Sequence, residues 1–184
     1  MEYATQILFF LGAIGVFNSL LISLNFLVNR SLALLPNRIF GWFLLILSLR
    51  VLKSVFYAFS TTKPIAFLQS GPYFFLLIGP FLLSYVQLLE NPNQKLSQYW
   101  KIHLACWIFI VVGLQVMIPF HQNVPLVKEV ILPMINLQWL AYILGSALSI
   151  RSSFFQLQPI PATQQWLRLL IIAILLLWAV YFFV

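Results

Sequence analysis

Apolar residues occur along the chain in six long runs that short polar segments separate. The runs cover residues 7–28, 39–60, 71–89, 102–120, 128–150 and 166–184. Each run is about 19–23 residues long, close to the ~20 residues that an α-helix needs to cross ~30 Å of hydrocarbon. The runs lack the alternation of a membrane β-strand, and an open sheet cannot satisfy its backbone polar groups in lipid. The pattern therefore predicts an all-α fold, a polytopic transmembrane helical bundle with six spans, forming a single domain over residues 1–184.

The composition agrees with a membrane protein. Hydrophobic residues make up 62% of the 184 residues and charged residues only 7%, whereas soluble domains carry about 25% charged residues. A soluble domain with so few charges would expose one continuous apolar surface. These values exclude a soluble enzyme and a disordered chain. Cys106 is the only cysteine, so no disulfide can form within one chain and a secreted disulfide scaffold is also excluded.

The distribution of basic residues predicts the orientation of the spans. The first, third and fifth loops and the start of the sixth run carry six of them: Arg30, Arg38, Lys95, Lys101, Arg151 and Arg168. The second and fourth loops carry Lys63 and Lys128. Because cytoplasmic loops are enriched in Lys and Arg, we expect an outside N-terminus and cytoplasmic loops at 29–38, 90–101 and 151–165. Six spans then also end outside, and because Val184 ends an apolar run without polar anchors, we expect the natural chain to continue into a seventh span.

The second run contains the least expected residues of the sequence, Arg50 and Lys53. Arg50 follows Ile39 by 11 residues, which places it roughly 16 Å into the bilayer. Arg50, Lys53, Ser54 and Tyr57 are spaced i, i+3, i+4 and i+7, so they share one helix face. An unpaired cation in lipid costs about 2.5–3.5 kcal/mol, so we expect this face to point into the bundle.

The three acidic residues, Glu2, Glu90 and Glu129, all lie at or beyond the ends of the spans, so none is available to neutralise these cations. We expect Arg50 to bond carbonyl oxygens freed at Gly79 and Pro80, or the side chains of Asn136 and Gln138. Two interpretations remain open. In the structural one, Lys53 reaches the outer interface and Arg50 only bonds carbonyls. In the functional one, the group Arg50, Lys53, Ser54, Tyr57, Asn136 and Gln138 binds a ligand or couples a signal, because intramembrane charge is usually functional.

Small residues and prolines predict packing and kinks. Gly79 and Pro80 should open the third span and Pro133 the fifth. The first run carries Asn18 and Asn25, seven residues apart on one face. A stripe of small residues on a neighbouring face of that run predicts close helix packing: Gly12, Gly15, Ser19 and Ser23.

Catalytic and metal-binding patterns are missing from the sequence. It has no Gly-rich phosphate loop and no H-E-x-x-H motif, and its few acids leave no carboxylate pair within the spans. His103 and His121 belong to opposite membrane faces, where they cannot share a metal. A Schiff base on Lys53 is the one covalent chemistry to consider, and nothing else supports it. We therefore expect no enzyme, no cofactor and no metal site.

Short motifs resemble the membrane-sensor half of membrane-bound AraC-type transcription regulators of Bacteroidota. The matching stretches are residues 10–19, 37–41, 49–56 and 77–82, together with Tyr85 and His103. The resemblance implies a seven-helix sensor in the bacterial inner membrane, joined to a cytoplasmic helix-turn-helix domain that binds DNA. This chain ends at Val184 without a seventh span or such a domain, so it would contact DNA only through a part that it lacks.

The sequence thus predicts a non-enzymatic sensor domain that couples an external or membrane-borne signal to a transcriptional output. A transporter or channel subunit with a polar cavity around Arg50 and Lys53 is the alternative, and an intramembrane enzyme comes third. The expected partners are the lipid bilayer, an anionic or small-molecule ligand, and a second copy of the chain.

Overall fold

The computed structural model describes residues 2–32, 34–59, 65–90, 98–119, 122–151 and 161–183. Six helical segments within them are long and apolar enough to cross a membrane, so the chain is an all-α, multi-pass membrane protein, as the apolar runs predict. The helices are α1 Glu2–Val28, α2 Leu35–Phe59, α3 Ile65–Glu90, α4 Gln98–Met117, α6 Leu132–Ser149 and α8 Ala162–Phe183. Shorter elements are the 3₁₀ turn η1 Arg30–Leu32, α5 Val124–Leu126 and the π-helical turn η2 Val127–Ile131, which leads into α6.

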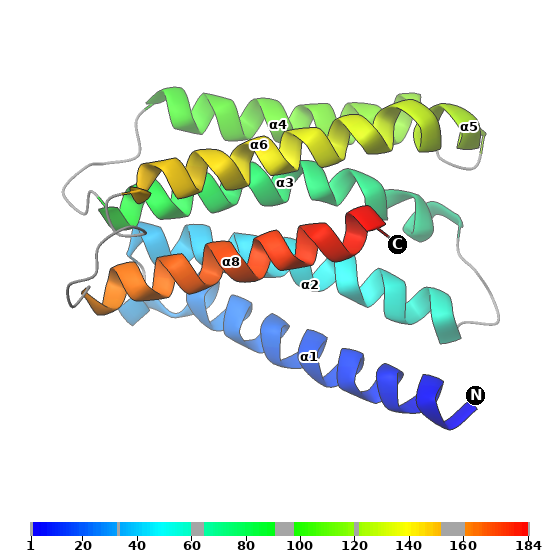
Figure 1. Cartoon of the computed structure of the whole chain (residues 1–184), viewed down its shortest axis with the longest axis horizontal. Coiled ribbons are helices and arrows are strands. Elements are labelled where there is room, and N and C mark those ends of the chain that lie inside the picture. Colours follow the sequence, from blue (N-terminus) through cyan, green and yellow to red (C-terminus); the bar gives the residue numbers. More distant parts are fainter. Residues whose placement is uncertain are drawn as a thin grey trace.

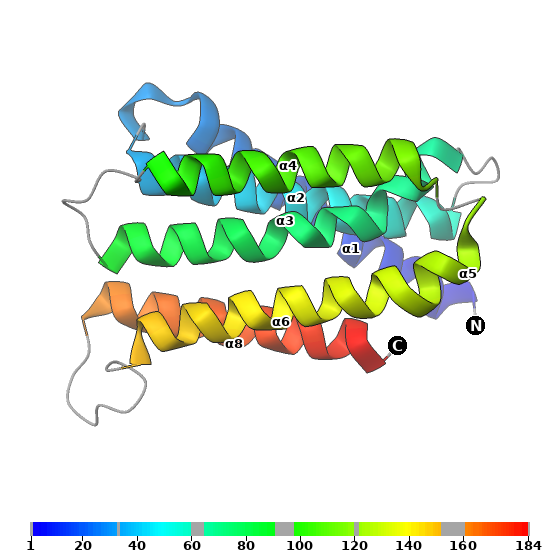
Figure 2. The same cartoon turned by 90° about the horizontal axis from the view of Figure 1, so that it is seen from above.

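Successive long helices run antiparallel to one another, as Figures 1 and 2 show. α1 packs on α2, α2 on α3, and α3 on both α4 and α6, while α8 packs on α6. The N-terminal end of α1 and the C-terminal end of α8 lie at the same end of the bundle (Figure 1). The C-terminal ends of α1, α3 and α6, which precede the segments predicted to be cytoplasmic, lie at the other end (Figure 1). Which end faces the cytoplasm stays a prediction.

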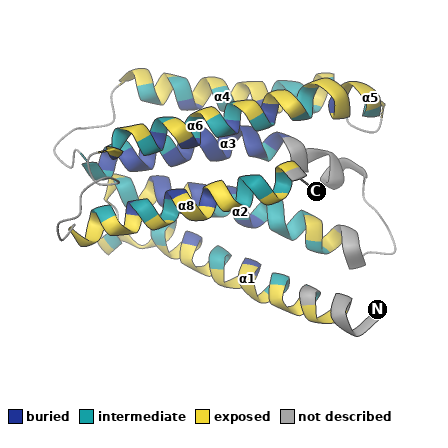
Figure 3. Ribbon diagram, viewed as in Figure 1, coloured by how far each residue is buried: buried dark blue, intermediate teal, exposed yellow. Residues whose placement is uncertain are grey.

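α3 is the central helix of the bundle. Most of its spanning part, Tyr73–Glu90, is buried, and its fully buried side chains include Tyr73, Ile78, Leu82 and Val86. α1 is its opposite, a peripheral helix that packs mainly against α2 and exposes most of its surface (Figure 3). Many of the side chains exposed in this bundle are large and apolar, which suits a surface that faces lipid rather than water.

All six spans begin four to six residues earlier than the apolar runs predict, and at three of them a proline stands at the helix start. α2 begins at Leu35 with Pro36 as its second residue, and α5 begins at Val124 with Pro125 in its first turn. Proline suits the first helical turn because its missing N–H has no intrahelical acceptor there. α8 begins directly after Pro161. The sequence interpretation treated these prolines as loop residues, although Pro36 and Pro125 lie in a first helical turn and Pro161 directly precedes α8.

The predicted kink positions fall in two different environments. Pro133 is the second residue of α6, immediately after the π-helical turn Val127–Ile131. π-Helical turns are rare, and a proline and a π-turn each interrupt the normal hydrogen-bond ladder of an α-helix. Gly79 and Pro80 instead lie inside α3, which stays helical from Ile65 to Glu90.

Candidate functional site

Arg50 points into the bundle from the buried face of α2. Three buried residues, Ile39, Phe43 and Ile46, precede it at positions i−11, i−7 and i−4 on the same face. Its guanidinium carbon lies 4.6 Å from the ring centre of Phe75 on α3 and 4.8 Å from that of Tyr181 on α8. Arg50 therefore connects three helices through cation–π contacts.

The hydrogen bonding of Arg50 is incomplete. Its Nη1 donates to Ser54 Oγ at 2.7 Å, whereas its buried Nε has no hydrogen-bond partner. The acidic residues of the chain do not reach this depth. Glu2 begins α1, Glu90 ends α3, and Glu129 lies in the π-helical turn. The positive charge is therefore held by aromatic rings and a hydroxyl instead of a carboxylate.

Trp139 extends the aromatic group that Arg50 contacts. Its ring centre lies 4.8 Å from that of Phe75 and 6.5 Å from that of Tyr181, and the Phe75 and Tyr181 rings are 5.0 Å apart. Trp139 is fully buried, and its Nε1 has no acceptor. We call Arg50, Phe75, Trp139 and Tyr181 the Arg50 cluster; it contains two buried N–H donors without partners.

The oxygens expected to accept from Arg50 do not bond it, and one of them, Gln138 Oε1, is itself buried without a partner. Pro80 has no N–H, so the Leu76 carbonyl one turn earlier lacks its usual intrahelical donor. Gln138 Nε2 donates to this carbonyl at 3.3 Å. For Asn136, whose side chain was the expected acceptor, the bond found is to the backbone oxygen, which accepts from Trp178 Nε1 at 3.1 Å. The expected acceptors of Arg50 are therefore not the ones found. Ser54, one turn along the same helix, is closer, and the planar guanidinium lies against rings.

The other residues predicted for this site on α2 are more exposed or lie outside the described side chains. Lys53 is partly exposed on α2, and Ser54 is exposed apart from its bond to Arg50. Tyr57 belongs to the α2 helix, but its side chain lies outside the described residues. The structure thus brings together Arg50 and Ser54 among the candidates on α2, and it places Gln138 against α3.

Small residues join α1 to α2. Ser23 Oγ donates to the Gly41 carbonyl at 2.8 Å, and Ser48 Oγ donates to Ser19 Oγ at 2.7 Å. A Cβ atom added to Gly12 would lie 3.1 Å from a methyl group of Val55, whereas one added to Gly15 would meet nothing within 4 Å. Gly12, Ser19 and Ser23 thus lie at the contact with α2, and Gly15 lies beside open space.

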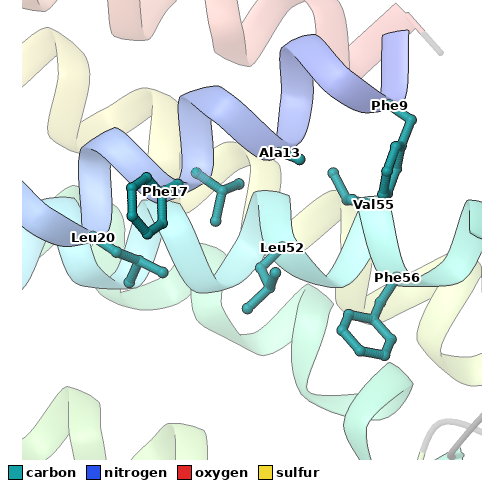
Figure 4. A pocket seen from close by; sticks show the side chains of 8 residues that line it. Phe9, Ala13, Phe17, Leu20, Leu52, Val55 and Phe56 are labelled. Atoms are coloured by element: carbon teal, nitrogen blue, oxygen red, sulfur yellow. The ribbon is translucent and has the colours of Figure 1, made fainter. Parts of the chain in front are cut away.

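An apolar groove of about 480 Å³ lies between α1 and α2 (Figure 4). Its α2 residues follow Arg50 by two, five and six positions, which places them on the opposite side of that helix. The groove is therefore separate from the Arg50 cluster, and its lining does not provide the polar cavity that the transport alternative expects. The lining residues are Phe9, Ala13, Val16, Phe17, Leu20, Leu52, Val55 and Phe56.

A second polar group, which the sequence interpretation missed, joins α4 to α6. The Tyr142 hydroxyl lies 2.6 Å from His103 Nε2 and accepts from Trp107 Nε1 at 2.8 Å. Gly79 makes room for this tyrosine, because an added Cβ would lie 2.8 Å from Tyr142 Cβ. The i, i+4 spacing of His103 and Trp107 was visible in the sequence, but their partner on α6 was not. His121 lies outside the described residues.

Comparison with known proteins does not identify a function for these sites, because no protein family, no curated protein and no solved structure matches the chain.

Proposed function

We propose that the chain is a non-enzymatic membrane sensor domain that recognises an anionic or hydrogen-bond-accepting signal at the Arg50 cluster. The observation that carries this proposal is a half-buried arginine without a carboxylate among the described residues, whose buried Nε has no acceptor, in a cluster where Trp139 Nε1 also lacks one. Buried polar groups normally have partners, and each exception calls for an explanation. A ligand with a charged oxygen would supply the missing acceptor.

Binding at this position would act on helix packing. Arg50 contacts rings on α3 and α8, and a cation–π contact contributes about 0.5–2 kcal/mol. A ligand that takes the guanidinium out of one of these contacts exchanges that energy for a charge-assisted hydrogen bond. The position of α8 relative to α2 then depends on occupancy, with a coupling of about 1–3 kcal/mol, typical of allosteric proteins.

The output proposed for this sensor follows from the resemblance to membrane-bound AraC-type regulators. In such a protein, the bundle would sit in a bacterial inner membrane with its N-terminus outside, and a cytoplasmic helix-turn-helix domain would bind DNA. DNA would therefore be reached only through a domain that these 184 residues do not contain.

The test measures ligand-dependent stability of the purified protein in neutral detergent. Decylphosphonate, an anion with a membrane-soluble tail, is compared with decanol, which has the same tail and no charge. At 100 times its dissociation constant, a ligand raises the free energy of unfolding by about 2.7 kcal/mol. We expect this shift with the phosphonate, its loss in Arg50→Met, and its retention in Arg151→Met, the matched control at an exposed position.

Two results would contradict the proposal. Equal stabilisation by decanol, or by decylphosphonate in the Arg50→Met variant, would show that the charge at Arg50 does not recognise the ligand. Arg50-dependent entry of decylphosphonate into proteoliposomes would instead support the transporter and count against a sensor.

A further inference from the structure

The face of α1 that points away from α2 carries a regular stripe of exposed residues. They follow one another at alternating spacings of four and three, the heptad repeat of helices that wind around each other. Five are large and apolar, with exposed fractions from 50% to 76%, and two are asparagines. We call these residues the α1 stripe: Ile7, Leu11, Ile14, Asn18, Leu21, Asn25 and Val28.

The α1 stripe and the α2 contact lie on opposite sides of the helix. Val16 and Ser23 are buried against the bundle, and Ser19 bonds Ser48 on α2. At about 100° per residue, these positions point away from Asn18 and Leu21. One side of α1 therefore packs against α2, and the opposite side is covered by no described helix.

Asn18 makes this second side more than a lipid-facing surface. It lies nine residues after Phe9, where the apolar part of α1 begins, which is about 14 Å along the helix and close to the bilayer midplane. Its side chain is exposed, and no hydrogen bond to its amide is found in the described part of the chain. An amide left unpaired in hydrocarbon is costly. Asn25 is different, because it lies near the helix end and accepts from Asn29 Nδ2 at 3.3 Å.

We propose that the α1 stripe binds the α1 stripe of a second copy of this chain, with Asn18 paired to Asn18 at the centre. Two copies inserted in the same orientation place their α1 helices parallel and at equal depth. A two-fold axis along the membrane normal then brings each stripe residue against its own counterpart. A carboxamide both donates and accepts hydrogen bonds, so an asparagine can pair with an identical asparagine. The aliphatic side chains on other exposed faces cannot form such a hydrogen bond.

The heptad spacing extends this contact beyond one residue pair. A 3.5-residue repeat keeps the stripe at the interface over the length of the helix and predicts a left-handed crossing near 20°. A polar residue at one core position of such a pair fixes its register. Interhelical hydrogen bonds of this kind also stabilise contacts within membranes.

The first experiment maps the interface by oxidative cross-linking of the full chain in native membranes. Cys106 is exposed, so it is replaced in the Cys106→Ser background, and single cysteines are introduced by Leu21→Cys and Leu24→Cys. Both leucines are 50% exposed and differ by less than one turn in depth, but Leu24 lies outside the stripe. We expect at least tenfold more covalent dimer for Leu21→Cys. Equal yields from both variants, or adducts with another protein only, would overturn the proposal.

The second experiment measures dimerisation by energy transfer between labelled copies in proteoliposomes at increasing lipid dilution. We expect Asn18→Leu to weaken association by about 5- to 30-fold and Asn18→Gln to retain most of it. The Asn18→Leu change removes no described hydrogen bond, so at dilutions where both proteins are monomeric its thermal unfolding should match that of the unmodified protein. Unchanged association in Asn18→Leu, or a monomer at every dilution of the unmodified protein, would refute the pairing.

Discussion

Replacing Gly79 by alanine should force α3 and α6 apart. An added Cβ would lie 2.8 Å from both Cβ and Cδ2 of Tyr142, whereas carbon atoms prefer separations of about 3.5–4.0 Å. The helices must therefore move by about 0.7 Å or more. Rotation of the tyrosine side chain does not relieve the contact, because its Cβ position is fixed by the α6 backbone.

The expected loss of stability follows from two opposing contributions. Overpacking of a well-packed site costs about 1–3 kcal/mol. Alanine regains up to about 1 kcal/mol of helix propensity relative to glycine. With the full regain, Gly79→Ala should therefore lower the free energy of unfolding by up to about 2 kcal/mol relative to the unmodified protein. Gly15→Ala is the matched control, because a Cβ there meets nothing within 4 Å, and it should be neutral or slightly stabilising.

Unfolding in mixed micelles at increasing SDS fraction, followed by tryptophan fluorescence, measures both variants. The difference between the Gly79 and Gly15 variants isolates the packing contribution, since the propensity gain is common to both. If the two variants unfold at the same SDS fraction, α3 and α6 do not approach closely at Tyr142, and the packing argument is wrong.

Two further predictions concern hydrogen bonds between helices. Gln138→Leu should lower the free energy of unfolding by about 1–2 kcal/mol, because it leaves the carbonyl freed by Pro80 without a donor. In a Pro80→Ala background, which restores the backbone bond, this cost should fall by about 0.5–1.5 kcal/mol. A double-mutant cycle in the same unfolding assay that shows no coupling would contradict this. Tyr142→Phe should lower the free energy of unfolding by about 1 kcal/mol, because it removes the hydroxyl that contacts both His103 and Trp107 between α4 and α6. Trp107→Phe should then destabilise the Tyr142→Phe variant less than it destabilises the unmodified protein.

Much of the fold could be predicted because the bilayer imposes it. A helix of about 20 apolar residues is one of very few ways to cross lipid, so run length alone predicts the six spans. The helix starts were less accurate, since proline breaks a helix interior but suits a first turn. Pro36 and Pro125 each belong to a helix that a composition-based boundary places later.

The candidate site was predictable in part for a similar reason. Arg50 shares a face with Ile39, Phe43 and Ile46, so helical spacing alone favours an inward arginine. Its partners could not be predicted, because they depend on which helices are neighbours in space. Tyr181 follows Arg50 by 131 positions and carries no periodic mark that connects the two.

The two faces of α2 contact different helices, so α2 connects α1 to the Arg50 cluster. One side is fastened to α1 by Ser19 and Ser23, and the other presents Arg50 to α3 and α8. Since α1 packs mainly against α2, a displacement of α2 carries α1 with it. If signal binding at Arg50 and pairing of α1 both hold, they form a linked equilibrium. Whatever factor the signal imposes on dimer affinity, dimerisation imposes in equal measure on affinity for the signal.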